Sequence, residues 1–91
     1  MKNNQTYAIQ YDPKAVKELS RLDTAVAQRI VRAVNKLQTQ PRPVDSRPLV
    51  GFPGLWRLRV ADYRVIYTIR DTEVTVILLR IVHRREVYNR L

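Results

Sequence analysis

The pattern that most constrains the fold is an alternation of apolar and basic side chains in the second half of the chain. Residues 56–60 read WRLRV, so the tryptophan, leucine and valine share one face of a strand while Arg57 and Arg59 share the other. Residues 63–69 read YRVIYTI and put Arg64 opposite four apolar or aromatic side chains. The sequence therefore predicts a sheet with a core on one face and Arg57, Arg59 and Arg64 together on an open face.

Turn-forming residues divide this half of the chain into three strands. We expect the strands at about residues 55–60, 63–70 and 73–82, with tight turns around Ala61-Asp62 and Asp71-Thr72. The remaining residues, 83–91, are predicted to form a helical turn or a short helix.

The first half of the chain is typical of one strand followed by two helices. Residues 6–11 alternate and are rich in strand formers, and Asp12 and Pro13 then supply a helix N-cap and a first-turn proline. Between residues 24 and 38, apolar side chains recur at spacings of four, four and three, which is one helical face. The two helices are predicted to form an antiparallel hairpin. Three prolines within residues 39–50 predict a connecting loop there rather than an element.

The order strand, helix, helix, strand, strand, strand predicts an α+β fold. A helical hairpin covers one face of a four-stranded sheet, in which the last three strands form an antiparallel meander. At 91 residues the chain is long enough for one domain and too short for two, so residues 1–91 are predicted to form a single domain. No apolar run reaches the roughly 18–20 residues that span a bilayer, and the start of the chain lacks a signal peptide's apolar stretch. We expect a cytoplasmic protein without membrane contact.

The charge balance predicts a polyanionic partner. Lysine and arginine number 17 against 8 aspartate and glutamate, giving a net charge of +9. Every basic residue from position 41 onward is arginine, whose planar guanidinium binds phosphate through two parallel hydrogen bonds and stacks on bases. This favours phosphate recognition, and the alternative is a basic face that is merely solvated.

Several kinds of site are excluded by what the chain lacks. It has no cysteine and one histidine, His83, which rules out disulfides, thiolate nucleophiles, zinc knuckles, iron–sulfur clusters and multi-histidine metal sites. Gly51 and Gly54 are the only glycines, so the glycine-rich nucleotide-binding loops are absent. We expect neither a metal nor a small-molecule cofactor. A lone histidine at a strand end is more typical of a structural residue than of a catalyst.

The end of the chain adds an aromatic candidate to the arginines. Arg84 and Tyr88 are four residues apart, so one helical turn places them on a common side. Guanidinium groups that hold a phosphate beside a tyrosine that stacks on a base suit an RNA strand. The alternative is that Tyr88 packs under the sheet and the arginines only keep the exposed face soluble.

Two segments, LWRLRVADYRVIY at residues 55–67 and IVHRREVY at residues 81–88, resemble the RelE/ParE superfamily of bacterial toxins, and the RelE branch is the closer match. The resemblance extends over nearly the whole chain as a single RelE-like domain. It implies the toxin of a type II toxin–antitoxin system: a ribosome-dependent endoribonuclease that cuts mRNA in the ribosomal A site and inhibits translation. The implied partners are the ribosome, mRNA and a cognate antitoxin. Two alternatives remain: a ParE-like toxin that inhibits DNA gyrase, and a non-catalytic basic module that binds RNA or an acidic partner.

The resemblance also implies roles for individual residues. It assigns catalysis to Arg57, Arg59, Arg64, Arg84 and Tyr88, and RNA contacts to Arg57, Arg59, Arg64, His83 and Arg85. The implied reaction needs no metal: the 2′-hydroxyl of the substrate attacks the adjacent phosphorus and gives a 2′,3′-cyclic phosphate and a 5′-hydroxyl.

In that reaction Arg57 and Arg64 orient the phosphate and offset its growing charge, and Arg84 assists the leaving 5′-oxygen. Two residues, Tyr88 and His83, are the alternatives for the general base that takes the proton of the 2′-hydroxyl. Well-studied RelE enzymes have lysine where this chain has Arg57 and Arg59. Because arginine does not readily release a proton, Arg59 is suited to stabilise charge and not to act as the base.

Overall fold

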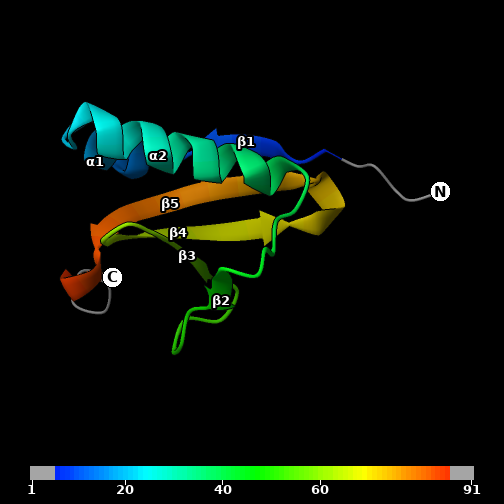
Figure 1. Cartoon of the computed structure of the whole chain (residues 1–91). Coiled ribbons are helices and arrows are strands. Elements are labelled where there is room, and N and C mark those ends of the chain that lie inside the picture. The colour runs from blue at the N-terminus through cyan, green and yellow to red at the C-terminus, as the bar shows by residue number, and fades with distance from the viewer. Residues whose placement is uncertain (1–5, 87–91) are drawn as a thin grey trace.

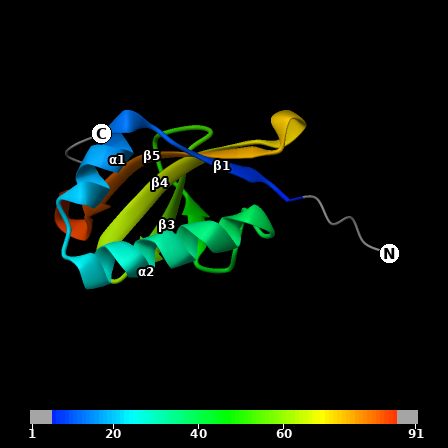
Figure 2. The same ribbon diagram turned by 90° about the horizontal axis from the view of Figure 1, so that it is seen from above.

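The structure is a computed structural model, and it describes residues 6–86. In chain order its elements are β1 (Ala8–Tyr11), α1 (Pro13–Ser20), α2 (Thr24–Asn35), the 3-10 turn η1 (Lys36–Gln38), β2 (Ser46–Pro48), β3 (Trp56–Val60), β4 (Tyr63–Arg70), η2 (Asp71–Glu73), β5 (Thr75–His83) and η3 (Arg84–Glu86). Both helices lie against the same face of one sheet (Figures 1 and 2). The predicted α+β fold is confirmed. None of the helices within residues 6–86 combines the length and the apolar character needed to cross a bilayer.

The sheet has five strands in the order β1-β5-β4-β3-β2, one more than the sequence predicted. β2, β3, β4 and β5 pair in antiparallel fashion, and β1 runs parallel to β5. The extra strand is β2, which lies inside the segment predicted to be a loop. It is short and sits at the sheet edge, where a proline such as Pro48 breaks no interior hydrogen bond.

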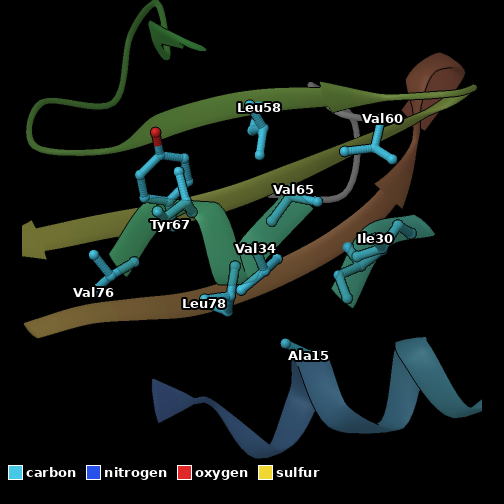
Figure 3. Close-up of a cluster of buried hydrophobic side chains, with 11 residues drawn as sticks. Ala15, Ile30, Val34, Leu58, Val60, Val65, Tyr67, Val76 and Leu78 are labelled. Carbon is cyan, nitrogen blue, oxygen red and sulfur yellow. The ribbon is translucent and has the colours of Figure 1, made fainter. Parts of the chain in front are cut away.

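The main core lies between the helices and the sheet, as Figure 3 shows. Its apolar side chains come from α1, from α2 with η1, and from β3, β4 and β5: Ala15, Ile30, Val34, Leu37, Leu58, Val60, Val65, Tyr67, Val76, Leu78 and Ile81. The predicted apolar stripe of α2 is thus the buried one, although Val26 is only partly buried. Trp56 also packs against this core while remaining partly exposed.

Helix α1 begins as the sequence predicted and contacts the edge of the sheet. The Asp12 side chain accepts a hydrogen bond of 2.9 Å from the Lys14 N–H, with Pro13 in the first turn. The pairing of β1 with β5 ends at Leu78. Beyond that point Glu18 of α1 accepts the Ile81 N–H at 2.7 Å, so a side chain takes the place of a strand neighbour.

A second, smaller core lies on the opposite face of the sheet. Leu49, Ile66 and Val82 are buried there, with Phe52 and Leu55 packed against them. The expectation that this face is open was therefore wrong for part of its area. The reason is Ile66, an apolar side chain that alternation places on the arginine side, where the segment between β2 and β3 covers it.

Candidate nucleic-acid interface

Four arginines lie in two cross-strand pairs on the sheet face opposite the helices. Arg59 of β3 pairs with Arg64 of β4, and Arg57 of β3 pairs with Arg47 of β2. The predicted convergence of Arg57, Arg59 and Arg64 is confirmed by this register, because Leu58 and Val65 between them point into the main core. We refer to these four residues as the arginine face. Like charges directly opposite one another destabilise a sheet, so this arrangement suits a bound anion.

A groove of about 540 Å³ runs along part of the arginine face. It is lined by Val44, Asp45, Arg47, Arg57, Arg59 and Ala61. The Nε atom of Arg57 is buried and has no hydrogen-bond partner among the described residues. Burial of a charged group without full hydrogen bonding is unfavourable. An anion in the groove would offset that cost.

Arg47 is the member of the arginine face that the sequence analysis missed. Its guanidinium donates 2.9 Å hydrogen bonds from one terminal nitrogen to the carbonyl oxygens of Val44 and Ser46, which fix the side chain beside the groove. Ser46 itself is buried and donates to the Pro43 carbonyl. No signal in the sequence marks Arg47, because the three residues of β2 are too few to show a strand period.

Arg84 comes to the same end of the sheet. Its backbone N–H donates to the Asp62 carbonyl at 2.8 Å, and its Nε lies 4.0 Å from the Asp62 carboxylate. Asp62 belongs to the turn that joins Arg59 to Arg64 across β3 and β4. The side chain of Arg84 is 49% exposed, so this ion pair leaves it accessible to a ligand.

The structure does not bring His83 onto the arginine face. His83 alternates with Val82 and so shares the helix-covered side with Ile81. Its ring meets that of Tyr63 edge to face, with centroids 5.4 Å apart. Its Nδ1 accepts the Arg85 N–H at 3.2 Å, and the Arg85 side chain is exposed. RNA contacts by His83 and Arg85 stay predictions, and Tyr88 lies outside the described residues.

A cluster of ionisable groups with shifted pKa values lies just after β4, around Asp71. The Arg42 guanidinium donates to the Asp71 carboxylate at 2.8 and 3.4 Å, and the Tyr7 hydroxyl donates to it at 2.7 Å. Hydrogen bonds from Arg42 first, and then from Tyr7, lower the pKa of Asp71, while the hydrogen bond to Asp71 raises the pKa of Tyr7. Arg42 also lies 5.5 Å from the centroid of the Trp56 ring. This cluster ties the loop before β2 to Tyr7 and to η2, and none of its members lines the groove of the arginine face.

Comparison with known proteins shows which family the chain belongs to. The profile of a family described as the ParE toxin of the type II toxin–antitoxin system parDE matches residues 9–88. The chain belongs to this toxin family. The match covers both helices, β2 to β5, all but the first residue of β1, and the arginine face. It confirms the resemblance to the RelE/ParE superfamily.

Similar proteins lie on the RelE side of the superfamily. The toxin RelG of Mycobacterium tuberculosis is 28% identical over 85 residues, covering 92% of this chain and 98% of that protein. The mRNA interferase toxin RelE of Escherichia coli is 28% identical over 87 residues, covering 91% and 90% of the two chains. The structure of the archaeal RelE–RelB complex from Pyrococcus horikoshii superposes with a TM-score of 0.77 at 28% identity, covering 94% of this chain and 99% of that one. These RelE and RelG toxins agree with the assignment of the chain to the RelE/ParE superfamily of type II toxins.

Proposed function

We propose that this toxin is a ribosome-dependent endoribonuclease that cleaves translated mRNA by attack of the substrate's own 2′-hydroxyl. The observation that supports it is the pairing of Arg59 with Arg64 across two rigid strands, with Arg84 at the same end of the sheet. Strands hold side chains in fixed positions, which is what stabilising the charge on a reacting phosphate requires. The 28% identity to an mRNA interferase over most of both chains agrees with this activity.

The reaction divides between binding the phosphate and moving protons. Arg57 and Arg64 hold the non-bridging oxygens and offset the charge that builds on them as the 2′-oxygen bonds to phosphorus. Arg59 adds to this charge stabilisation, and Arg47, fixed by its two carbonyl contacts, holds a neighbouring phosphate of the strand. As the P–O5′ bond breaks, Arg84 donates a hydrogen bond to the leaving 5′-oxygen.

The proton on the 2′-hydroxyl needs a base that the arginine face does not contain. Arginine does not deprotonate under ordinary conditions, so none of the four residues accepts it. Tyr88 and His83 stay the two candidates, with His83 on the other side of the sheet from the arginines. Because its own base is weak, we expect such an enzyme to depend on the ribosome to align the RNA.

We also propose that an antitoxin neutralises the chain, because the archaeal relative is seen in a toxin–antitoxin complex. An arginine face in a chain with a net charge of +9 suits an acidic segment. Carboxylates of that segment pair with the arginines, and apolar contacts elsewhere supply most of the affinity.

Primer extension on a reporter mRNA in induced cells tests the activity, with and without a start codon. We expect cuts on the translated message and none on the untranslated one. Arg59→Ala and Arg64→Ala should each lower single-turnover cleavage on programmed ribosomes on the order of 10²–10³-fold. Arg70→Ala is the matched control, since Arg70 is an exposed arginine at the opposite end of the same strand.

Other outcomes point elsewhere. Cuts that persist on the untranslated message contradict ribosome dependence. Intact mRNA with broken DNA favours the gyrase-directed alternative, which the ParE description of the matching family keeps open. Equal cleavage by wild type, Arg59→Ala and Arg64→Ala removes the arginine face from catalysis.

A further inference from the structure

The groove of the arginine face contains a carboxylate that phosphate binding does not explain. Asp45 lines this groove beside three of the four arginines: Arg47, Arg57 and Arg59. A carboxylate repels a phosphate, so Asp45 weakens the attraction of its neighbours for one. Within residues 6–86 the Asp45 side chain accepts no hydrogen bond and joins no ion pair. Its oxygens are therefore open to hydrogen-bond donors of a ligand.

The backbone holds Asp45 in a fixed position beside the groove. Val44 and Asp45 are the central residues of a tight turn, which the Ser46 N–H closes with a 2.9 Å hydrogen bond to the Pro43 carbonyl. The hydroxyl of the buried Ser46 donates to the same carbonyl at 2.8 Å, and the Arg47 guanidinium donates to the Val44 carbonyl at 2.9 Å. A group whose position is fixed in advance loses less entropy when it binds a ligand.

An exposed apolar side chain lies next to this carboxylate. Val44 is 83% exposed, belongs to neither core and lines the same groove. Bases of single-stranded RNA are recognised by side chains that cover the flat face of the ring and by hydrogen bonds along its edge. Val44 and Asp45 supply one group of each kind. The groove of about 540 Å³ also has the size of a small-ligand site, roughly 300–1,000 Å³, and so has room for a base beside a phosphate.

We propose that Val44 and Asp45 form a nucleobase site that selects guanine next to the cleaved phosphate. Guanine presents two neighbouring donors, N1–H and the N2 amino group, and one ionised carboxylate accepts both in parallel. Adenine and cytosine place an acceptor nitrogen next to the amino group, and uracil has one N–H between two carbonyl oxygens, so each turns an acceptor toward the carboxylate. The proposal rests on the proposed function in placing the cleaved strand on the arginine face.

Asp45→Asn changes the hydrogen-bonding pattern and keeps the size of the side chain. An amide presents one donor and one acceptor, which match the amino group and ring nitrogen of adenine or cytosine and not the two donors of guanine. Asp23→Asn is the matched control, because Asp23 is exposed, does not line the groove and caps a helix equally well as asparagine.

Val44→Ser tests the apolar half of the site. It should weaken binding of strands carrying any base by about two- to fivefold, because contact with the ring face does not depend on the edge. Val50→Ser is its control, since Val50 is 77% exposed and lies outside the groove.

The first measurement is the affinity for short 2′-O-methyl uridine strands in which one central base is guanine, inosine, adenine or cytosine. These strands lack the attacking hydroxyl, so they are not cleaved, and their sugars donate no hydrogen bond to Asp45. We expect wild type to bind the guanine strand about tenfold or more tightly than the others, including inosine, which lacks the N2 amino group. Asp45→Asn should lose this preference and favour adenine or cytosine, whereas Asp23→Asn should keep it.

The second measurement is single-turnover cleavage on programmed ribosomes, with each position of the A-site codon varied among the four bases. We expect wild type to cleave fastest with guanine at one position beside the cut. In Asp45→Asn this advantage should fall about tenfold or more relative to wild type. Thermal unfolding of each variant checks that it is folded.

Three results would overturn the proposal. Equal base preferences of wild type and Asp45→Asn show that the carboxylate does not read the base. A change of the same size for all four bases reduces the effect of Asp45 to general electrostatics, as does an equal change in Asp23→Asn. Binding that distinguishes guanine from adenine but not from inosine removes the paired hydrogen bonds. Failure of the proposed nuclease activity is distinguishable, because the 2′-O-methyl strands report base selection without cleavage.

Discussion

The carboxylate of Glu18 joins the helical layer to the strand leading into the site. It accepts a hydrogen bond of 2.7 Å from the Ile81 N–H and two more, of 2.7 and 3.0 Å, from the Arg80 guanidinium. The side chain of Arg80 is 15% exposed and that of Glu18 is 19% exposed. Hydrogen bonds to a charged group in such a setting contribute more than those between neutral groups. The position of β5 just before His83 and Arg84 therefore depends on α1.

Glu18→Gln is expected to lower the free energy of unfolding by about 1.5–3 kcal/mol, because the carboxylate's charge-assisted hydrogen bonds are lost. Urea denaturation measures it, with an unchanged m-value if the native state keeps its compactness. Glu73→Gln removes the same charge from an exposed position and is the control. Equal midpoints for the two variants would mean that the Glu18 contact does not hold the strand.

Asp71 gives the fold a specific dependence on acid pH. Its pKa lies below the ordinary value of 3.8 because Arg42 and Tyr7 donate to its ionised form. A carboxylate with a depressed pKa in the folded state stabilises the fold above the unfolded-state value, and this contribution is lost as the pH falls through the folded-state value. Wild type should therefore exceed Asp71→Asn in stability at neutral pH, and the gap should shrink below about pH 4.

Thermal unfolding of both proteins between about pH 2 and pH 7 measures this gap. Because Arg42 and Asp71 are exposed, about 1 M salt should narrow the gap at neutral pH as well. A gap that is constant across this pH range would contradict the assignment.

At the scale of elements, the segment between β2 and β3 stabilises the sheet face that carries the arginines. Leu49, 3% exposed, packs on the fully buried Ile66, whereas its neighbour Val50 is 77% exposed. Leu49→Ala is expected to cost about 2–4 kcal/mol of stability, since it opens a cavity beneath this segment. Val50→Ala is the matched truncation and should change stability by less than about 0.5 kcal/mol. Chemical denaturation compares them, and similar losses would show that the smaller core contributes little.

The accuracy of the sequence predictions differs between elements for physical reasons. β3 and β4 could be predicted because five to eight residues show the two-residue period several times, and that period also placed Arg57, Arg59 and Arg64 on one face. β2 could not, since three residues with a proline carry no period, and Arg47 was missed with it. The irregular register near Ile66, which shifts the pairing of β4 with β5, has no signal in the sequence either.

Other parts of the site depend on relations between elements that are distant in the sequence. β1 lies beside β5 and not beside β2 at the other edge of the sheet. Packing of the whole chain decides this position. His83 was expected among the RNA contacts, and its place opposite the arginines follows from the strand register at the end of β5. The helical hairpin could be predicted because caps and apolar spacing are local.

At the scale of the whole molecule, a tightly bound antitoxin should raise the melting temperature of the toxin. A ligand that binds only the folded state at a free concentration of one hundred times its Kd adds about 2.7 kcal/mol, which corresponds to about 10–20 °C for a domain of this size. Differential scanning fluorimetry across antitoxin concentrations measures the rise. An unrelated acidic protein of similar charge is the control, and a similar rise with it would reduce the effect to general electrostatics.

The pairing of the first strand with the last has a consequence for how the chain is made. Ala8 of β1 lies beside Thr75 of β5, and β5 also forms the centre of the main core through Val76 and Leu78. A nascent chain that has emerged only as far as β4 lacks the strand against which β1 and α1 pack. Contacts between such distant positions form late, after local ones. The arginine face is therefore not supported by a folded scaffold until synthesis has passed β5, so the nuclease activity proposed for it cannot arise on the nascent chain before that point.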